Sequence, residues 1–150
     1  MKLKHTKTLS IILLMILSAI KVWAQQPVRL SSAGKIMDIT ILKKLINEPG
    51  INNKEVRIEV VSFPPGSTSP PHMHPCPTFG YVLEGEIESV FEGQKHIYKQ
   101  GDSFYEKSFG LHSVTHNNNL SKQAKLLVFF IADPNQSTSV PPKNSSKVDR

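Results

Sequence analysis

The stretch PPGSTSPPHMHPCPTFGYVLEG, residues 64–85, decides the fold, because it joins a loop rich in proline and glycine to the start of an apolar strand. The loop presents two histidines, His72 and His74, two positions apart. In extended backbone, residues i and i+2 point to the same side of the chain, with Cα atoms about 6.5–7 Å apart. One metal ion can therefore accept both imidazoles.

A third histidine, His112, follows the segment GDSFYE and is expected on a different strand. A β-barrel assembles a site from strands that are distant in sequence, so His112 can join the first two histidines. His116 lies four residues further on, a span of about 13 Å in extended backbone. We therefore expect His116 not to share an ion with His112.

Short apolar segments separated by Gly, Pro or Asn clusters make up most of the remaining chain, a pattern typical of an all-β sandwich or barrel. These segments are EVRIEVVSF, FGYVLEG, EIESVFEG, HIYKQGD, SFYE, HSVTH and AKLLVFFIAD. In the first of them, Val56, Ile58 and Val60 fall on one face of a strand. Arg57 and Glu59 fall on the other face, which is the period-two signature of a half-buried strand.

The segment ITILKKLIN, residues 39–47, is the one stretch with helical spacing of apolar residues. It fits either a short helix or a strand that runs into a loop, because Pro49-Gly50 ends it abruptly. The sequence leaves both alternatives open.

Residues 1–24 have the features of a secretory signal peptide: a basic start, an apolar run from Leu9 to Ile20, and the cleavage pattern Val22-Trp23-Ala24. The apolar run is about a dozen residues long, shorter than the roughly 20 residues that span a bilayer. We therefore expect cleavage after Ala24 and no stable membrane anchor. The protein is expected to be exported, either to the periplasm or out of the cell.

After the leader, we expect a single domain. An irregular segment over 25–34 precedes a β-barrel domain over 35–134, and a polar, disordered tail follows over 135–150, where Ser, Pro, Lys and Asn dominate. The leader holds four of the 18 Lys and Arg and none of the 12 Asp and Glu, so the mature charge is 14 minus 12, or +2. So small a charge argues against nucleic acid as a partner, because such binding needs clustered Lys and Arg.

Cys76 is the only cysteine, so no disulfide can form within the chain. Its place two residues after His74 leaves two interpretations open. The thiol is either a reactive group beside a metal ion or an ordinary loop residue without chemistry.

The spacing of the first two histidines resembles the first sequence motif of the cupin superfamily. That motif runs glycine, five residues, His-x-His, three or four residues, glutamate, six residues, glycine. Gly66, His72, His74 and Gly85 fit this spacing.

The second cupin motif, built around a glycine and a histidine, is matched by Gly101 and His112 in GDSFYEKSFGLHSVTHN, residues 101–117. Three of its positions differ, because Lys107, Phe109 and His116 stand where the motif has Pro, Gly and Asn. The resemblance covers residues 55–134.

The resemblance implies a single-domain cupin, an all-β double-stranded β-helix or jelly-roll-like barrel, with one divalent metal ion on His72, His74 and His112. Thr78 occupies the position of the carboxylate ligand in the family motif. Three alternatives follow for the missing oxygen ligand. Glu106 turns into the barrel and supplies it, or the site stays three-histidine, as in the thiol dioxygenases of the superfamily, or Glu106 is a solvated rim residue and no ligand at all.

Fe, Zn, Mn, Ni and Cu all remain open as the metal ion, because imidazole ligands alone do not select among them. Two classes of function remain open as well. One is a metal-dependent enzyme, dioxygenase-like or isomerase-like, acting on a small organic molecule in the barrel. The other is a metal- or ligand-binding module without turnover. No catalytic residue can be assigned from the sequence, the expected partner is a small molecule, and a homodimer stays open.

Overall fold

The computed structural model describes residues 34–142, and this part of the chain consists of nine β-strands joined by turns and loops, with no helix. The predicted leader and the residues up to 33, together with residues 143–150, lie outside the described residues. The strands are β1 (Met37–Glu48), β2 (Ile51–Phe63), β3 (His72–Met73), β4 (Thr78–Glu84), β5 (Glu86–Phe91), β6 (Gln94–Lys99), β7 (Ser103–Glu106), β8 (Leu111–His116) and β9 (Ala124–Ala132).

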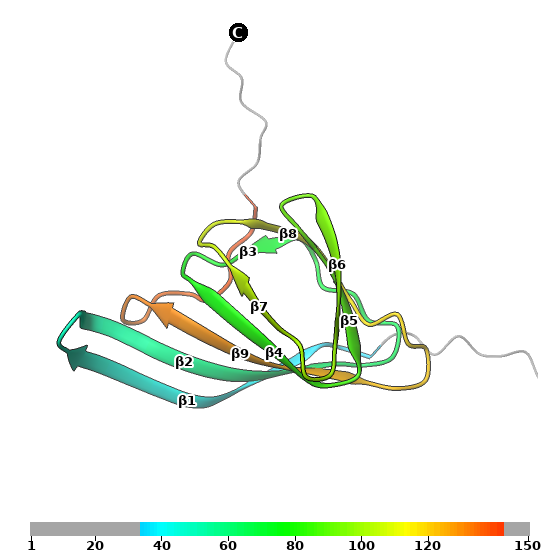
Figure 1. The fold of residues 1–150 in the computed structure, drawn as a ribbon, viewed down its shortest axis with the longest axis horizontal. Coiled ribbons are helices and arrows are strands. Elements are labelled where there is room, and N and C mark those ends of the chain that lie inside the picture. Colours follow the sequence, from blue (N-terminus) through cyan, green and yellow to red (C-terminus); the bar gives the residue numbers. More distant parts are fainter. Residues whose placement is uncertain (1–33, 143–150) are drawn as a thin grey trace, which may run out of the picture. The chain divides into compact units, whose positions relative to one another are not determined.

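The strands form the two antiparallel sheets of a jelly-roll-like barrel (Figure 1). The five-stranded sheet has the order β1-β2-β9-β4-β7, and the four-stranded sheet has the order β3-β8-β5-β6. Neighbours within each sheet are often far apart in the sequence, as β2 and β9 are. The predicted all-β class is confirmed.

The segment 39–47 belongs to strand β1, so its interpretation as a helix was wrong. β1 pairs with β2 along its length, and two of its apolar residues face apolar partners: Ile39 lies opposite Val60, and Leu42 lies opposite Ile58. Pro49 and Gly50 form the turn between the two strands, where Gly50 has a φ of 87°, a conformation that glycine adopts without strain. The strand continues to the turn because cross-strand pairing outweighs the local helical spacing.

The alternation predicted for β2 is present, but the interior face of this strand is its polar one. Glu55, Glu59 and Phe63 are buried, whereas the valine and isoleucine face is only partly covered. Pairing with β9 explains this orientation, because Glu59 lies opposite Val128, which is one of the buried residues that alternate along β9. The interior of the barrel therefore contains charged groups beside its apolar core.

The apolar core is built from alternate residues of several strands: Phe63, Cys76, Val82, Ile87, Ala124, Leu126, Val128, Phe130 and Ala132. Cys76 belongs to this core, and burial raises the pKa of its thiol. A thiol with a raised pKa forms the reactive thiolate less readily. The structure thus favours the interpretation of Cys76 as a residue without chemistry.

Residues 135–142 differ from the predicted polar tail, because they pack against the barrel. Met73 and Val140 pair as an isolated β-bridge, each amide donating to the other's carbonyl at 2.9 Å. Arg57 also donates to the carbonyl of Gln136 at 3.3 Å. Backbone pairing of this kind does not depend on side-chain hydrophobicity, so the polar composition of the segment gave no sign of it.

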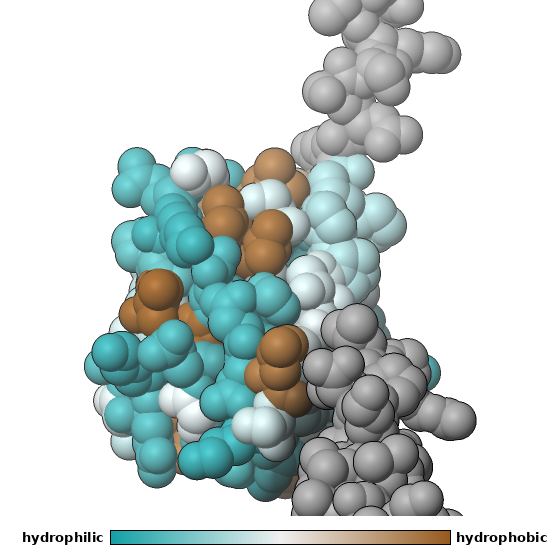
Figure 2. Space-filling view, turned by 90° about the vertical axis from the view of Figure 1, so that its right-hand side faces the viewer, coloured by the Kyte–Doolittle hydropathy of each residue, from teal (hydrophilic) through white to brown (hydrophobic). Residues whose placement is uncertain are grey.

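The face in Figure 2 is mostly hydrophilic, with hydrophobic residues in separate small groups. Single exposed apolar groups of this kind are normal on a protein surface. Within residues 34–142 there is no helix with the length and apolar character needed to cross a membrane.

Candidate metal centre

Three histidines meet inside the barrel because β3 pairs with β8. In this register His72 lies directly opposite His112, and His74 follows His72 by two residues. Each histidine offers one ring nitrogen to the cluster, and these three nitrogens lie within 4.8 Å of one another. The structure thus brings together the three histidines that the sequence singles out.

Glu106 lies beside this cluster, at the end of β7. Its Oε1 atom is 3.4 Å from Nε2 of His112, and its Oε2 atom is 3.7 Å from Nε2 of His74. The residue is only 3% exposed, so the interpretation of Glu106 as a solvated rim residue was wrong. The phenylalanines and tyrosine around it in the sequence had left the direction of this strand undetermined.

Thr78, at the family's carboxylate position, is the direct cross-strand partner of Glu106. Its side chain is 1% exposed, and its hydroxyl donates a hydrogen bond to the carbonyl of Cys76 at 3.1 Å. The carboxylate that the family motif would place on β4 is therefore found one strand further on, on β7. Both positions lie on the inner face of the same sheet.

Backbone carbonyls orient two of the three rings. Nδ1 of His72 lies 3.0 Å from the carbonyl of Pro70, and Nδ1 of His74 bonds to the carbonyl of Thr138. A carbonyl only accepts, so each Nδ1 carries the proton and each Nε2 keeps its lone pair for another partner. Carbonyls that bond to the outer ring nitrogen fix the tautomer of metal-bound histidines in the same way.

His112 is the most enclosed of the three rings, with hydroxyl groups on both sides. The Oγ atom of Ser89 lies 2.8 Å from its Nε2, and Thr115 Oγ1 lies 3.4 Å from both ring nitrogens. A metal ion at this Nε2 would replace the contact with Ser89. Ser89 could have been found from the sequence, because Glu86 and Glu88 alternate on the outer side of β5 and leave Ser89 facing inward. Nothing in the sequence pointed to Thr138.

The electrostatics of the cluster suit an incoming cation. Burial lowers the pKa of His112 to about 3 and that of His74 to about 4, so both rings are neutral and able to bind metal at neutral pH. Burial also raises the pKa of Glu106 to about 7, because nothing positive compensates its charge. A divalent ion would supply that compensation, so this set of donors fits a metal ion.

The cluster opens onto a cavity of about 340 Å³, a size at the lower end of small-molecule sites. The three histidines and Glu106 lie in its wall. Phe104, Leu126 and Phe130 are among its apolar lining residues. Gly80 makes room for Phe104, whose ring would lie 2.0 Å from any Cβ placed there. A small organic molecule can thus reach the histidine nitrogens from an apolar chamber.

His116 and His96 stay outside the cluster, as expected. His116 lies opposite Glu88 in the β5–β8 pair, and His96 is on the exposed strand β6. The motif has Gly and Asn at the positions of Phe109 and His116. In this chain Gly110 and Asn117 stand one residue later. Gly110 accommodates the ring of Phe91, and the buried amide of Asn117 bonds to the carbonyls of Phe63 and Lys122. Both residues hold loops together.

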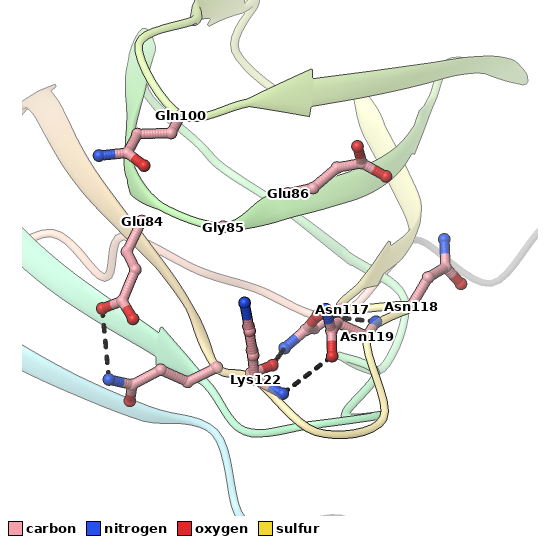
Figure 3. Close-up of a pocket in the computed structure, with 9 residues that line it drawn as sticks. Glu84, Gly85, Glu86, Gln100, Asn117, Asn118, Asn119 and Lys122 are labelled. Carbon is pink, nitrogen blue, oxygen red and sulfur yellow. Dashed lines mark hydrogen bonds between the residues drawn. The ribbon is translucent and has the colours of Figure 1, made fainter.

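A second cavity, of about 530 Å³, lies between the β4–β5 turn and the loop after β8 (Figure 3). Its side chains are engaged with one another: Gln123 donates to Glu84 at 3.3 Å, and Asn117 accepts from the amide of Asn119 at 3.0 Å. This cavity is a polar junction between loops, and it contains no histidine or cysteine.

The described chain is a small two-sheet barrel with three clustered histidines that face an inner cavity and could hold a metal ion. The family model described as a cupin domain matches residues 59–130 of this chain. Residues 59–130 thus match the cupin domain, and the barrel has the cupin fold.

Curated relatives match only a short part of the chain. It is 46% identical over 44 residues to germin-like protein subfamily 2 member 2 of Arabidopsis thaliana, a match to 29% of this chain and 20% of that protein. It is 50% identical over 40 residues to germin-like protein 3-5 of Oryza sativa subsp. japonica, covering 26% of this chain and 18% of the relative. The matched segment thus spans about a fifth of the length of these relatives.

Solved structures resemble the chain over most of its length, at identities that show the fold alone. KdgF from Halomonas sp. has a TM-score of 0.54 and 21% identity, over 67% of this chain and 81% of that one. An RmlC-like cupin from Shewanella frigidimarina has a TM-score of 0.53 and 19% identity, over 70% and 83% of the two chains. An oxalate oxidase in complex with glycolate has a TM-score of 0.53 and 21% identity, over 81% and 66%.

Proposed function

We propose that this protein is an exported cupin that binds one divalent metal ion through His72, His74 and His112, with Glu106 as the oxygen ligand. The observation that carries the proposal is the position of Glu106. This buried carboxylate lies within 3.7 Å of two of the clustered histidine rings and has no other cation beside it among the described residues. Burying a charge without a partner is costly, and a metal ion removes that cost.

Three imidazoles and one carboxylate leave coordination positions for a molecule in the cavity, as catalytic rather than structural metal sites do. A bound ion would supply Lewis-acid or redox chemistry to that molecule. We therefore propose a metal-dependent reaction, dioxygenase-like or isomerase-like, on a small organic substrate. The alternative is binding without turnover. Metal identity separates oxygenase chemistry from the other possibilities, because a redox-active ion favours oxygenase chemistry, whereas zinc favours binding or a non-oxidative reaction.

Elemental analysis of the purified protein tests the metal site. Changing His72, His74 or His112 singly to Ala should reduce metal content to a small fraction of the wild-type value, because each change removes one ligand. His96→Ala is the matched control, since His96 is exposed on β6. Unchanged metal content in the triple histidine variant would refute the site, whereas equal loss in all four single variants would indicate unfolding.

Export is proposed from the leader alone, whose residues lie outside the described part of the chain. We expect the exported protein to begin at Gln25, because the cleavage pattern ends at Ala24. N-terminal sequencing of the protein recovered from outside the cytoplasm measures this directly. Recovery of Met1 on the exported protein would contradict cleavage.

A further inference from the structure

The far end of the cavity carries two carboxylates that the metal centre does not use. Asp38 on β1 and Glu59 on β2 both line the cavity that contains the histidines. Strand pairing brings them together, because Asp38 lies opposite Val61 and Thr40 lies opposite Glu59. Neither carboxylate corresponds to a position of the two sequence motifs.

Glu59 is a buried carboxylate with a single, long hydrogen bond. The residue is only 7% exposed, and Thr40 donates to its Oε1 at a long 3.4 Å. Among residues 34–142, no hydrogen bond reaches its Oε2 and no lysine or arginine forms an ion pair with it. Buried carboxylates are normally paired or fully hydrogen-bonded, so the bonding of Glu59 by Thr40 alone is incomplete.

Among the described residues, the charged groups near Glu59 do not neutralise its carboxylate. Arg57, on the same face of β2, donates from Nε and Nη2 to Glu55 and so is already paired. Asp38 is a second negative group. Burial and the charge of Asp38 together raise the pKa of Glu59, although Arg57 acts in the opposite direction. A cation between Asp38 and Glu59 would relieve both effects.

A polar atom beside β8, in the other sheet, lacks a hydrogen-bond partner in the same cavity. The hydroxyl of Ser69 is buried and has no hydrogen-bond partner among the described residues, and Ser69 lines the same cavity. The wall between the two ends is apolar, with Val61, Leu126 and Val128. Polar groups at both ends of an apolar chamber are typical of a site for a small molecule with two polar ends.

The register of the sheet gives the scale of that molecule. Glu59 and Glu106 stand on β2 and β7, which are separated by β9 and β4. Three strand spacings amount to about 14 Å between backbones, and both side chains extend into the barrel and shorten the gap. A chain of a few carbon atoms spans such a distance.

We propose that Asp38 and Glu59 form an ammonium-binding subsite, so that the ligand of this cavity is a small primary amine whose other end lies at the histidine cluster. The part of this proposal that concerns the other end rests on the proposed metal function. The ammonium subsite itself is independent of any metal ion. The amine would donate to the unpaired oxygen of Glu59, a charge-assisted hydrogen bond that a neutral ligand cannot replace.

Two matched probes test the subsite without a metal-binding group. Pentylammonium and 1-pentanol have the same chain length and differ in charge. We would titrate each into the purified, isotope-labelled protein, as isolated and after treatment with a chelator, and follow backbone amide shifts by NMR. Pentylammonium should bind about tenfold or more tightly than pentanol, with the largest shifts at Glu59, Val61 and Val128.

Isosteric variants assign the preference to the two carboxylates. Glu59→Gln should abolish the preference for pentylammonium, and Asp38→Asn, at an exposed position, should reduce it without disturbing the core. Glu86→Gln, on the exposed face of β5, is the matched control and should leave it unchanged. If Glu59→Gln does not fold, Asp38→Asn alone decides the question.

Equal affinity for the two probes in the wild type would overturn the subsite, as would a preference that survives Glu59→Gln or, where that variant does not fold, Asp38→Asn. These outcomes are separate from the metal result. A protein without metal that still prefers pentylammonium supports the subsite and contradicts the metal proposal. A metal-loaded protein that binds the two probes equally supports the metal proposal and contradicts the subsite.

Discussion

At the scale of single residues, the proposed oxygen ligand Glu106 lies on the strand next to the one where the cupin motif places a carboxylate. Glu106 and Thr78 face each other on neighbouring strands, and both are almost fully buried. Side chains directly opposite in an antiparallel pair have Cβ atoms about 4.5–5.5 Å apart. A carboxylate on either strand can therefore extend to the same region beside the histidines.

Exchanging the two side chains tests this idea. Glu106→Thr should weaken metal retention by at least about tenfold, because it removes the anionic ligand. Thr78→Glu alone should also weaken it, because a second carboxylate is forced into a packed site beside the first. The double variant Thr78→Glu/Glu106→Thr should recover most of the wild-type retention, measured by competition with a chelator. Tighter binding in Thr78→Glu alone would mean that Thr78 points at the metal and that Glu106 is not the ligand.

At the scale of elements, the centre depends on two short backbone pairings. The two-residue strand β3 places His72 opposite His112, and the bridge between Met73 and Val140 keeps the C-terminal segment against it. That segment carries the carbonyl of Thr138, which holds the ring of His74. Residues outside the barrel strands thus orient a ligand within it.

Truncation after Asn135 should therefore lower metal affinity by about 10- to 100-fold, the usual cost of losing a group that orients a metal-bound histidine. The barrel strands stay intact in this variant, so far-UV circular dichroism should change little. Truncation after Pro142 is the matched control, because it keeps Thr138 and the bridge to Met73. Equal metal affinity in the two truncated proteins, measured by chelator competition, would show that the carbonyl of Thr138 has no role.

At the scale of the whole molecule, the barrel interior holds ionisable groups whose folded pKa values shift in opposite directions. His112 and His74 have folded pKa values of about 3 and 4, below the ordinary 6.5, so the folded state is less stable as the pH falls below 6.5. Glu106 has a folded pKa of about 7, above the ordinary 4.5, so its contribution is lost as the pH rises from 4.5 through 7. The pKa of Glu55 is lowered by the hydrogen bond from Arg57, so acid also removes its contribution.

For the metal-free protein, we predict that stability falls slowly from pH 6.5 to 4.5 and steeply below 4.5. Between pH 6.5 and 4.5, the unfolded state gains protons on two histidines, and the proton that Glu106 holds in the folded state offsets part of this effect. Below pH 4.5, Glu106 is protonated in both states and no longer offsets it. Glu106→Gln should raise the free energy of unfolding at pH 8 by up to about 3 kcal/mol. This limit is the difference between the ordinary pKa of 4.5 and the folded pKa of about 7, converted at 1.36 kcal/mol for each pKa unit. Urea denaturation over this pH range measures both effects. Loss of stability at pH 8 in Glu106→Gln would show that this carboxylate is already compensated without metal.

The class of fold and three residues of the candidate site could be predicted from the sequence. Period-two alternation and turn residues are local properties, so they predict strands and a barrel without knowledge of the pairing. The spacing of His72 and His74 is local as well. His112 was found because it stands in a second motif whose own spacing is local.

Which strand faces turn inward and which distant groups meet could not be predicted without the folded barrel. Alternation in β2 shows that two faces differ, but pairing with β9 determines that the face of Glu55 and Glu59 is the interior one. The choice between Thr78 and Glu106 depends on the register of β4 and β7, and the contact of Thr138 with His74 joins residues 64 positions apart. Long-range register of this kind is set by packing of the whole barrel, because no short segment contains the information on which strand will be its neighbour.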